Sequence, residues 1–146
     1  DGLHHAAGSR KVHEVHGTYR TGRCPKCAAE YEMRGFYEEL ERGHLRVPQC
    51  AKCAAPIKPD IILFGELLPA DAWRGAVEAA ERCDLMLVLG SSLVVYPVAE
   101  LPAIALSNSA GLVIVNLDST GYDHLATVTV RGRLGEFAAA ALDALN

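Results

Sequence analysis

Two pairs of cysteines constrain this chain more than any other feature of its sequence. Cys24 and Cys27 form one C-x2-C pair, Cys50 and Cys53 form a second, and 22 residues separate the pairs. Each pair turns two thiolates toward one point, and two such turns supply the four sulfur ligands of a tetrahedral Zn²⁺. A redox pair or disulfides are the alternatives, but two matched pairs without a secretory signal favour zinc. Because four thiolates close the coordination shell, we expect one structural Zn²⁺ per chain that performs no chemistry.

Charge sets the cysteine region apart from the rest of the chain. Residues 20–58 hold 8 of the 14 basic residues and 5 of the 18 acidic ones, a balance of +3, whereas the whole chain carries −4. We therefore predict a small zinc-binding module over residues 20–57, inserted into a larger domain made of residues 1–19 and 58–146. The overall negative charge argues against specific nucleic-acid binding.

Strands and helices alternate in the sequence that follows the cysteines. Apolar runs without polar alternation are typical of parallel strands that are covered on both faces. The fold class expected from this order is α/β, a partial Rossmann-like parallel sheet carrying the zinc-ribbon module. The predicted strands are 61–64, 85–89, 112–115 and 126–130, and residues 12–16 are predicted to be a short strand or an extended segment. The predicted helices are 33–42, one from 70, one from 97 that Pro102 should bend or shorten, and 136–145.

Other sequence features bear on location and completeness. No apolar run approaches the roughly 20 residues of a membrane helix, and no charged-then-apolar leader opens the chain. We therefore expect a cytoplasmic protein without a membrane partner. The chain begins at Asp1 without an initiator Met, so we expect it to be a segment of a longer protein.

Polar residues follow three of the predicted strands, where open parallel sheets bind their ligands. Gly90 would let a ligand approach the backbone, and Ser91 and Ser92 offer hydroxyl and N–H groups of the kind that phosphates use. Asn116 and Asp118 could hold ribose hydroxyls or an adenine edge. Plain turns are the alternative at each position, but three polar strand ends together favour a nucleotide site. Position alone does not distinguish His16 from His13 as a base.

These motifs, in their order along the chain, resemble those of the sirtuins, the NAD-dependent protein lysine deacylases, most closely the bacterial and archaeal members. The resemblance extends over nearly the whole sequence. It rests on Asp1-Gly2-Leu3-His4 with Ala7-Gly8, on His16-Gly17, on both C-x2-C pairs, on residues 59–66, on Gly90-Ser91-Ser92-Leu93 with Pro97, and on Asn116.

The resemblance implies a role for each group of residues. His16 would be the general base, and a neutral imidazole near pH 7 suits that task. The products would be nicotinamide, free lysine and an O-acyl-ADP-ribose. NAD would be held by Asp1, Gly90, Ser91, Ser92, Asn116, Leu117, Asp118 and Leu134; an acetylated or acylated lysine peptide would add as a strand beside Ile62, Phe64, Gly65 and Val95.

Parts of the family pattern are missing from the sequence. The G-A-G-x-S loop and the flexible cofactor-binding loop are absent, so the resemblance covers the second half of the enzyme. We expect this segment alone to be inactive, with an uncovered apolar face beside Leu85–Leu89 or Leu112–Val115. A sirtuin-like ADP-ribosyltransferase and a non-catalytic zinc-ribbon interaction module remain the alternatives.

Overall fold

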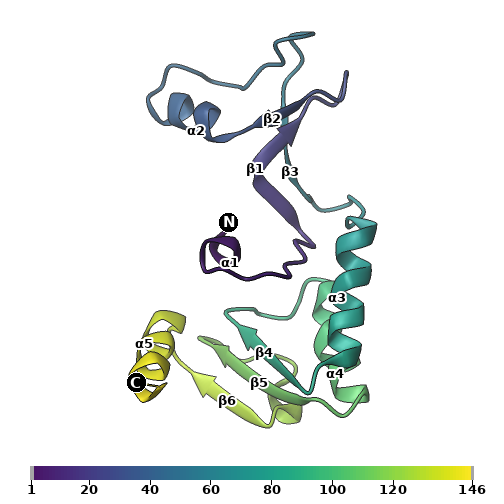
Figure 1. Ribbon diagram of the computed structural model, residues 1–146, viewed down its shortest axis with the longest axis vertical. Helices are drawn as coiled ribbons and strands as arrows, with labels where there is room; N and C mark the ends of the chain where they lie inside the picture. Colours follow the sequence, from purple (N-terminus) through teal and green to yellow (C-terminus); the bar gives the residue numbers. More distant parts are fainter. Residues whose placement is uncertain (1, 146) are drawn as a thin grey trace. The chain divides into compact units, whose positions relative to one another are not determined.

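The computed structural model describes residues 2–145 of the chain (Figure 1). The chain divides into two compact units, Asp1–Trp73 and Arg74–Asn146, with the boundary inside helix α3 (Ala70–Arg82). Each unit is built around its own sheet. Among the helices between residues 2 and 145, none has both the length and the apolar character needed to cross a membrane.

The first unit contains a three-stranded antiparallel sheet in the order β2-β1-β3. Its core joins Met33 and Ile57 to the buried cysteines Cys24 and Cys50, so the cysteine region is also the hydrophobic centre of this unit. In chain order the elements are α1 (Leu3–Ala6), β1 (Gly17–Arg23), β2 (Glu30–Glu32), α2 (Arg34–Glu41) and β3 (Lys58–Ile61).

A glycine begins β1 because the backbone there allows no side chain. Gly17 has a φ of +74°, and a Cβ at this position would lie 1.9 Å from the carbonyl oxygen of Asp60. The neighbouring Ile62 N–H donates a 3.0 Å hydrogen bond to the His16 carbonyl. The start of β1 is therefore held tightly against the end of β3, and His16 is placed at this junction.

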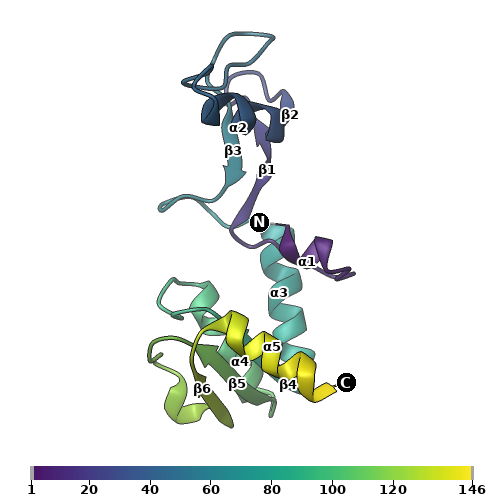
Figure 2. The same cartoon turned by 90° about the vertical axis from the view of Figure 1, so that its left-hand side faces the viewer.

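The second unit contains a parallel sheet in the order β4-β5-β6 (Figure 2). Its buried centre includes Val88, Leu112 and Ile114. Helix α4 packs against β4 and β5, and helix α5 contacts β5. The elements are β4 (Leu85–Leu89), the 3₁₀ turn Val98–Glu100, α4 (Leu101–Ser107), β5 (Gly111–Asn116), the 3₁₀ turn Asp123–Leu125, β6 (Val128–Arg131) and α5 (Leu134–Leu145).

One face of β4 is apolar and open to solvent. Leu85, Leu87 and Leu89 are 56%, 49% and 43% exposed, and β5 is the one strand that pairs with β4 among the described residues. The expected uncovered face beside Leu85–Leu89 is therefore present. The alternative position, Leu112–Val115, is well covered, since Leu112, Ile114 and Val115 are buried.

Three predicted elements differ from the structure. The strand expected at 61–64 is Lys58–Ile61, because the chain turns at Leu63, whose N–H and carbonyl both bond to Glu66. The segment 12–16 is not a strand; the strand follows it. Pro102 lies in the first turn of α4 instead of bending a helix, and there its missing N–H has no partner to lose.

Candidate metal centre and nucleotide pocket

The four paired cysteines converge on one point, as the spacing predicts. All four Sγ atoms lie within 4.8 Å of one another. The Cys24–Cys53 and Cys27–Cys50 sulfurs are 3.4 Å and 3.5 Å apart, and the Cys53–Cys27 sulfurs are 3.7 Å apart. Sulfurs placed 2.3 Å from a tetrahedral zinc would be about 3.8 Å from each other. The four cysteines lie close enough to hold one zinc ion, and none of them is in a disulfide.

The two cysteine turns have the same backbone geometry. In the first, Cys24 N–H donates to the carbonyl of Ala29 and Ala28 N–H donates back to Cys24; in the second, Cys50 bonds in the same way with Ala55 and Ala54. Ala28 and Ala54 share a φ of 57°, a left-handed conformation that a residue with a Cβ rarely adopts. This repeated strained turn is what aims each pair of sulfurs at the common centre.

A tyrosine supports the sulfur cluster from outside. The Tyr31 hydroxyl donates to Cys50 Sγ over 3.1 Å and accepts a 3.0 Å hydrogen bond from the Ala51 N–H. This hydroxyl, assisted by the Lys52 N–H, lowers the pKa of the Cys50 thiol to about 6. A thiol that ionises readily suits a metal-bound thiolate. The edge-to-face packing of Phe36 against the Tyr31 ring, with centroids 5.9 Å apart, keeps the phenol in place.

His16 lies in a second feature of the same unit, a pocket of about 310 Å³. The pocket brings the predicted base together with the start of the chain and with His13. It is lined by Gly2, His4, His5, Val12, His13, Glu14, Val15, His16 and Gly17. His16 is exposed. Asp1, one of the residues expected to hold NAD, is outside the described residues.

The residues expected to contact a substrate peptide are divided between the units. Ile62 bonds through its N–H to the His16 carbonyl, and Phe64, two residues later, is 96% exposed. Gly65 has a φ of +88°, which permits the turn that ends this segment. Val95 belongs to the second unit and is 42% exposed. The peptide cleft itself remains a prediction.

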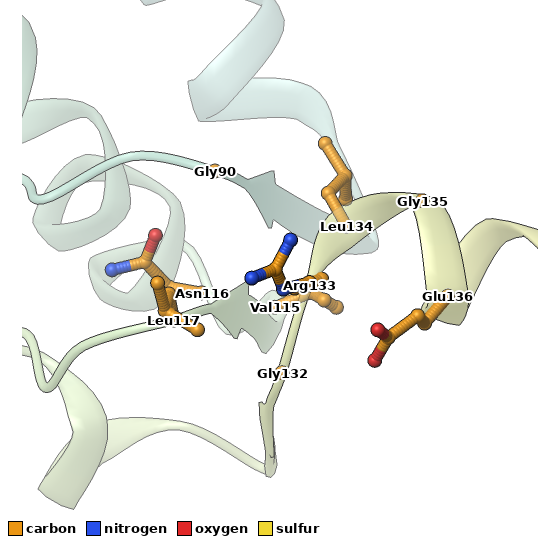
Figure 3. Close-up of a pocket in the computed structure, with 9 residues that line it drawn as sticks. All are labelled: Gly90, Val115, Asn116, Leu117, Gly132, Arg133, Leu134, Gly135 and Glu136. Carbon is orange, nitrogen blue, oxygen red and sulfur yellow. The ribbon is translucent and has the colours of Figure 1, made fainter.

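A pocket of about 550 Å³ lies where β4 and β5 of the second unit end (Figure 3). Four residues expected to bind NAD line it: Gly90, Asn116, Leu117 and Leu134. Gly90 has a φ of +62°, and a Cβ there would meet the Leu134 side chain at 3.5 Å. That separation is an ordinary van der Waals contact, so the left-handed backbone is what favours glycine at this position.

Three other predicted NAD contacts do not line this pocket. Ser91 Oγ accepts a 3.4 Å hydrogen bond from the Leu93 N–H, so its hydroxyl shapes the turn after β4. Ser92 is exposed, and Asp118 accepts a hydrogen bond from Asn116 Nδ2 through its backbone carbonyl over 3.0 Å. Asp118 thus orients the Asn116 amide with its main chain, and its carboxylate is not used for this contact.

Sequence reasoning missed five of the nine residues that line this pocket. Val115, Gly132, Arg133, Gly135 and Glu136 also line the pocket (Figure 3). Gly132 and Arg133 lie in the turn between β6 and α5, and Gly135 and Glu136 lie at the start of α5. The glycines at 132 and 135 around the predicted Leu134 were the available signal, because a ligand can approach glycine backbone closely.

Comparison with known proteins finds relatives that are described as NAD-dependent protein deacetylases. A protein deacetylase from Thermotoga maritima described as NAD-dependent is 46% identical over 138 residues, 94% of this chain and 55% of that protein. NAD-dependent protein deacetylase 1 of Pyrobaculum aerophilum is 42% identical over all of this chain and 56% of its own length. The chain therefore spans little more than half the length of these relatives.

Solved structures show the same similarity in three dimensions. The structure of Sir2Tm bound to a propionylated peptide matches with a TM-score of 0.88 at 44% sequence identity. The match includes 97% of this chain and 59% of that one. A Sir2 structure with a p53 peptide and NAD+ matches with a TM-score of 0.87 at the same identity, over 58% of its length. The model of the Sir2 family matches residues 1–97, and this chain belongs to that family.

Proposed function

We propose that this chain carries the zinc module, the general base and the adenosine end of the NAD+ site of a protein lysine deacylase. The enzyme would transfer the acyl group from lysine to ADP-ribose with release of nicotinamide, and water completes the balance that yields free lysine and O-acyl-ADP-ribose. The observation that carries the proposal is an exposed His16 in a pocket with the Gly2–His5 segment, in a chain of the Sir2 family.

The surroundings of His16 support its proposed role as the group that accepts a proton. Its backbone is fixed by the bond from Ile62 N–H and by the close approach of Gly17 to Asp60, while the imidazole remains exposed in the pocket. NAD+ supplies the ribose carbon that receives the acyl oxygen as nicotinamide leaves. His16 would take a proton from a ribose hydroxyl, and Asp1 would hold the nicotinamide carboxamide.

The pocket at the ends of β4 and β5 would hold the adenosine part of NAD+. Asn116, held by the Asp118 carbonyl, presents an amide to a ribose, and Leu117 and Leu134 provide apolar contact for a base. Gly90 admits the ligand close to the backbone, and the neighbouring Ser91 and Ser92 would contact its phosphate and ribose groups.

The remaining parts of the proposal concern the peptide, the modules and the location. An acylated lysine peptide would pair as a strand beside Ile62, Phe64, Gly65 and Val95. The nearly complete exposure of the Phe64 side chain supports a binding surface at this segment. Residues 20–57 would be a zinc module inserted between 1–19 and 58–146. A cytoplasmic location agrees with four paired cysteines that are not in disulfides.

The test compares histidine variants in the complete gene product that contains these residues. His16→Ala should reduce the NAD+-dependent transfer of a labelled acetyl group from an acetyl-lysine peptide to ADP-ribose by at least ~10²-fold, the low end for a positioned general base. His13→Ala, which alters the same pocket, should have a smaller effect, and His124→Ala in the second unit serves as the folding control. Equal activity of His16→Ala and the unmutated enzyme would refute the proposal; labelled ADP-ribose on protein without free lysine would indicate a transferase instead.

A further inference from the structure

An arginine that no sequence motif singles out links three segments around the His16 pocket. Arg20 is in β1, and its Nη2 donates to both carboxylate oxygens of Glu14, over 3.0 Å and 3.1 Å. Its Nε donates to Thr18 Oγ1 over 3.1 Å, and its own N–H donates to the same oxygen over 3.2 Å. The guanidinium is thus fixed to the strand on one side and to the loop before His16 on the other.

The stem of Arg20 lies against the start of the chain. A Cβ on Gly2 would be 3.1 Å from Arg20 Cδ and 3.5 Å from Nε, so the arginine packs directly on the Gly2 backbone. Gly2 follows Asp1 in the sequence, and the Gly2 carbonyl accepts the first hydrogen bond of α1, from the Ala6 N–H. One side chain therefore contacts both the segment proposed to hold nicotinamide and the loop that carries the proposed base.

Glu14 completes the link from the other side. It is two residues before His16, its carbonyl accepts a 2.9 Å bond from the Gly17 N–H, and its carboxylate is 3.9 Å from His5 Nε2. The Glu14 side chain is only 28% exposed. Fixing this carboxylate fixes the turn 14–17, and with it the direction in which the His16 side chain leaves the backbone.

We propose that Arg20 and Glu14 form a positioning pair that sets His16 and the Gly2 segment in their working geometry for the proposed reaction. The inference rests on the proposed function for its catalytic consequence. Neither residue needs to touch the substrate. A base displaced by about 1 Å can lose on the order of 10²-fold in rate, so a loosened turn should lower kcat while peptide binding beside Ile62 and Phe64 persists.

The kinetic test uses a double-mutant cycle in the complete gene product. Arg20→Met and Glu14→Gln should each reduce kcat by roughly tenfold or more with the peptide KM within about twofold, and the double variant should be no worse than either single variant. Arg20→Lys keeps the positive charge toward Glu14 and should restore part of the activity. Arg23→Met is the matched control, because Arg23 is on the same strand and its ion pair with Glu30 is exposed.

A second measurement does not depend on activity. The Ile62 N–H bonds to the His16 carbonyl, so its hydrogen exchange reports how firmly the turn is held. Exchange at Ile62 should accelerate in Arg20→Met and Glu14→Gln and remain unchanged in Arg23→Met, with zinc content constant. If the unmutated protein has no deacylase activity, the proposed function is refuted, and the exchange rate of the Ile62 amide still tests whether Arg20 and Glu14 hold the turn. The inference would be overturned if Arg20→Met had the same kcat and the same Ile62 exchange rate as the unmutated protein. It would also be overturned if the losses in the double variant were additive.

Discussion

Replacing Gly17 by alanine should destabilise the first unit more than any other glycine-to-alanine change with a comparable backbone. The new Cβ would be built 1.9 Å from the Asp60 carbonyl oxygen, a separation that real Cβ atoms do not show. Because the obstructing atom is backbone, relief requires the strand β3 or the start of β1 to move. That movement would also stretch the hydrogen bond from Ile62 N–H to the His16 carbonyl.

The expected loss in the free energy of unfolding of Gly17→Ala has two contributions. A left-handed backbone costs an L-residue about 1–2 kcal/mol. Forcing extra volume into packed structure costs about another 1–3 kcal/mol. The free energy of unfolding should therefore fall by roughly 2–5 kcal/mol.

Alanine substitutions at two other glycines measure these two contributions separately. Gly8 has a similar φ of +81° with nothing within 4 Å of its built Cβ, so Gly8→Ala should show the backbone cost alone. Gly35 is in α2, also with open space around it, and Gly35→Ala should stabilise by up to about 1 kcal/mol. Urea unfolding of the zinc-loaded protein, followed by circular dichroism and by exchange of the Ile62 amide, gives all three values. Equal losses for Gly17→Ala and Gly8→Ala would show that the contact with Asp60 does not constrain this turn.

Three further outcomes test the metal centre and the second unit. The chain should bind about one zinc, and Cys50→Ala should remove it and disorder residues 20–57 while Cys83→Ala leaves the zinc content unchanged; a well-ordered metal-free module would contradict this. Tyr31→Phe should weaken zinc binding about 10–100-fold in chelator competition, because Cys50 loses its hydroxyl donor, and unchanged affinity would argue against that role. The Thr120 hydroxyl, with Arg131, lowers the pKa of Asp123 in the folded protein below its usual 3.8. The ionised carboxylate therefore stabilises the fold above pH 3.8, and this contribution is lost as the pH falls through the lower pKa of the folded state. Asp123→Asn should therefore lower the urea midpoint at neutral pH and converge with the unmutated protein in strong acid; a constant difference across pH would refute the assignment.

The metal centre could be predicted from the sequence because its determinants are local. A C-x2-C turn contains its own geometry, and the structure shows the same hydrogen bonds around Cys24 and Cys50. The buried strands were also predictable, since Leu112–Val115 is apolar at every position and is covered on both faces. Leu85–Leu89 has the same pattern, yet the described sheet leaves one of its faces open.

Other features depend on partners far away in the sequence. Strand β1 contains two glycines and two arginines, and its two threonines and one tyrosine do not form the continuous apolar run that marks the buried strands of the second unit. It forms because β2 and β3 pair with it on either side. Residues 132–136, the turn after β6 and the start of α5, similarly line the same pocket as Asn116, a proximity that no local pattern encodes. The link between Arg20 and Glu14 is likewise visible only once the loop and strand are folded.

The position of the cysteines next to the β1–β3 ladder has a consequence for the order of folding. Cys24 follows Arg23 directly, Arg23 pairs with Lys58, and Cys53 precedes Lys58 by a short segment. Binding of the metal by both cysteine pairs would close the loop between them. After that, each further residue pair between β1 and β3 costs little additional conformational entropy. The ladder can then form stepwise away from the metal, toward Gly17 and Ile61. The His16 turn would be the last part of the ladder to close and the first to open, so the metal site would determine how quickly a newly made chain forms this turn.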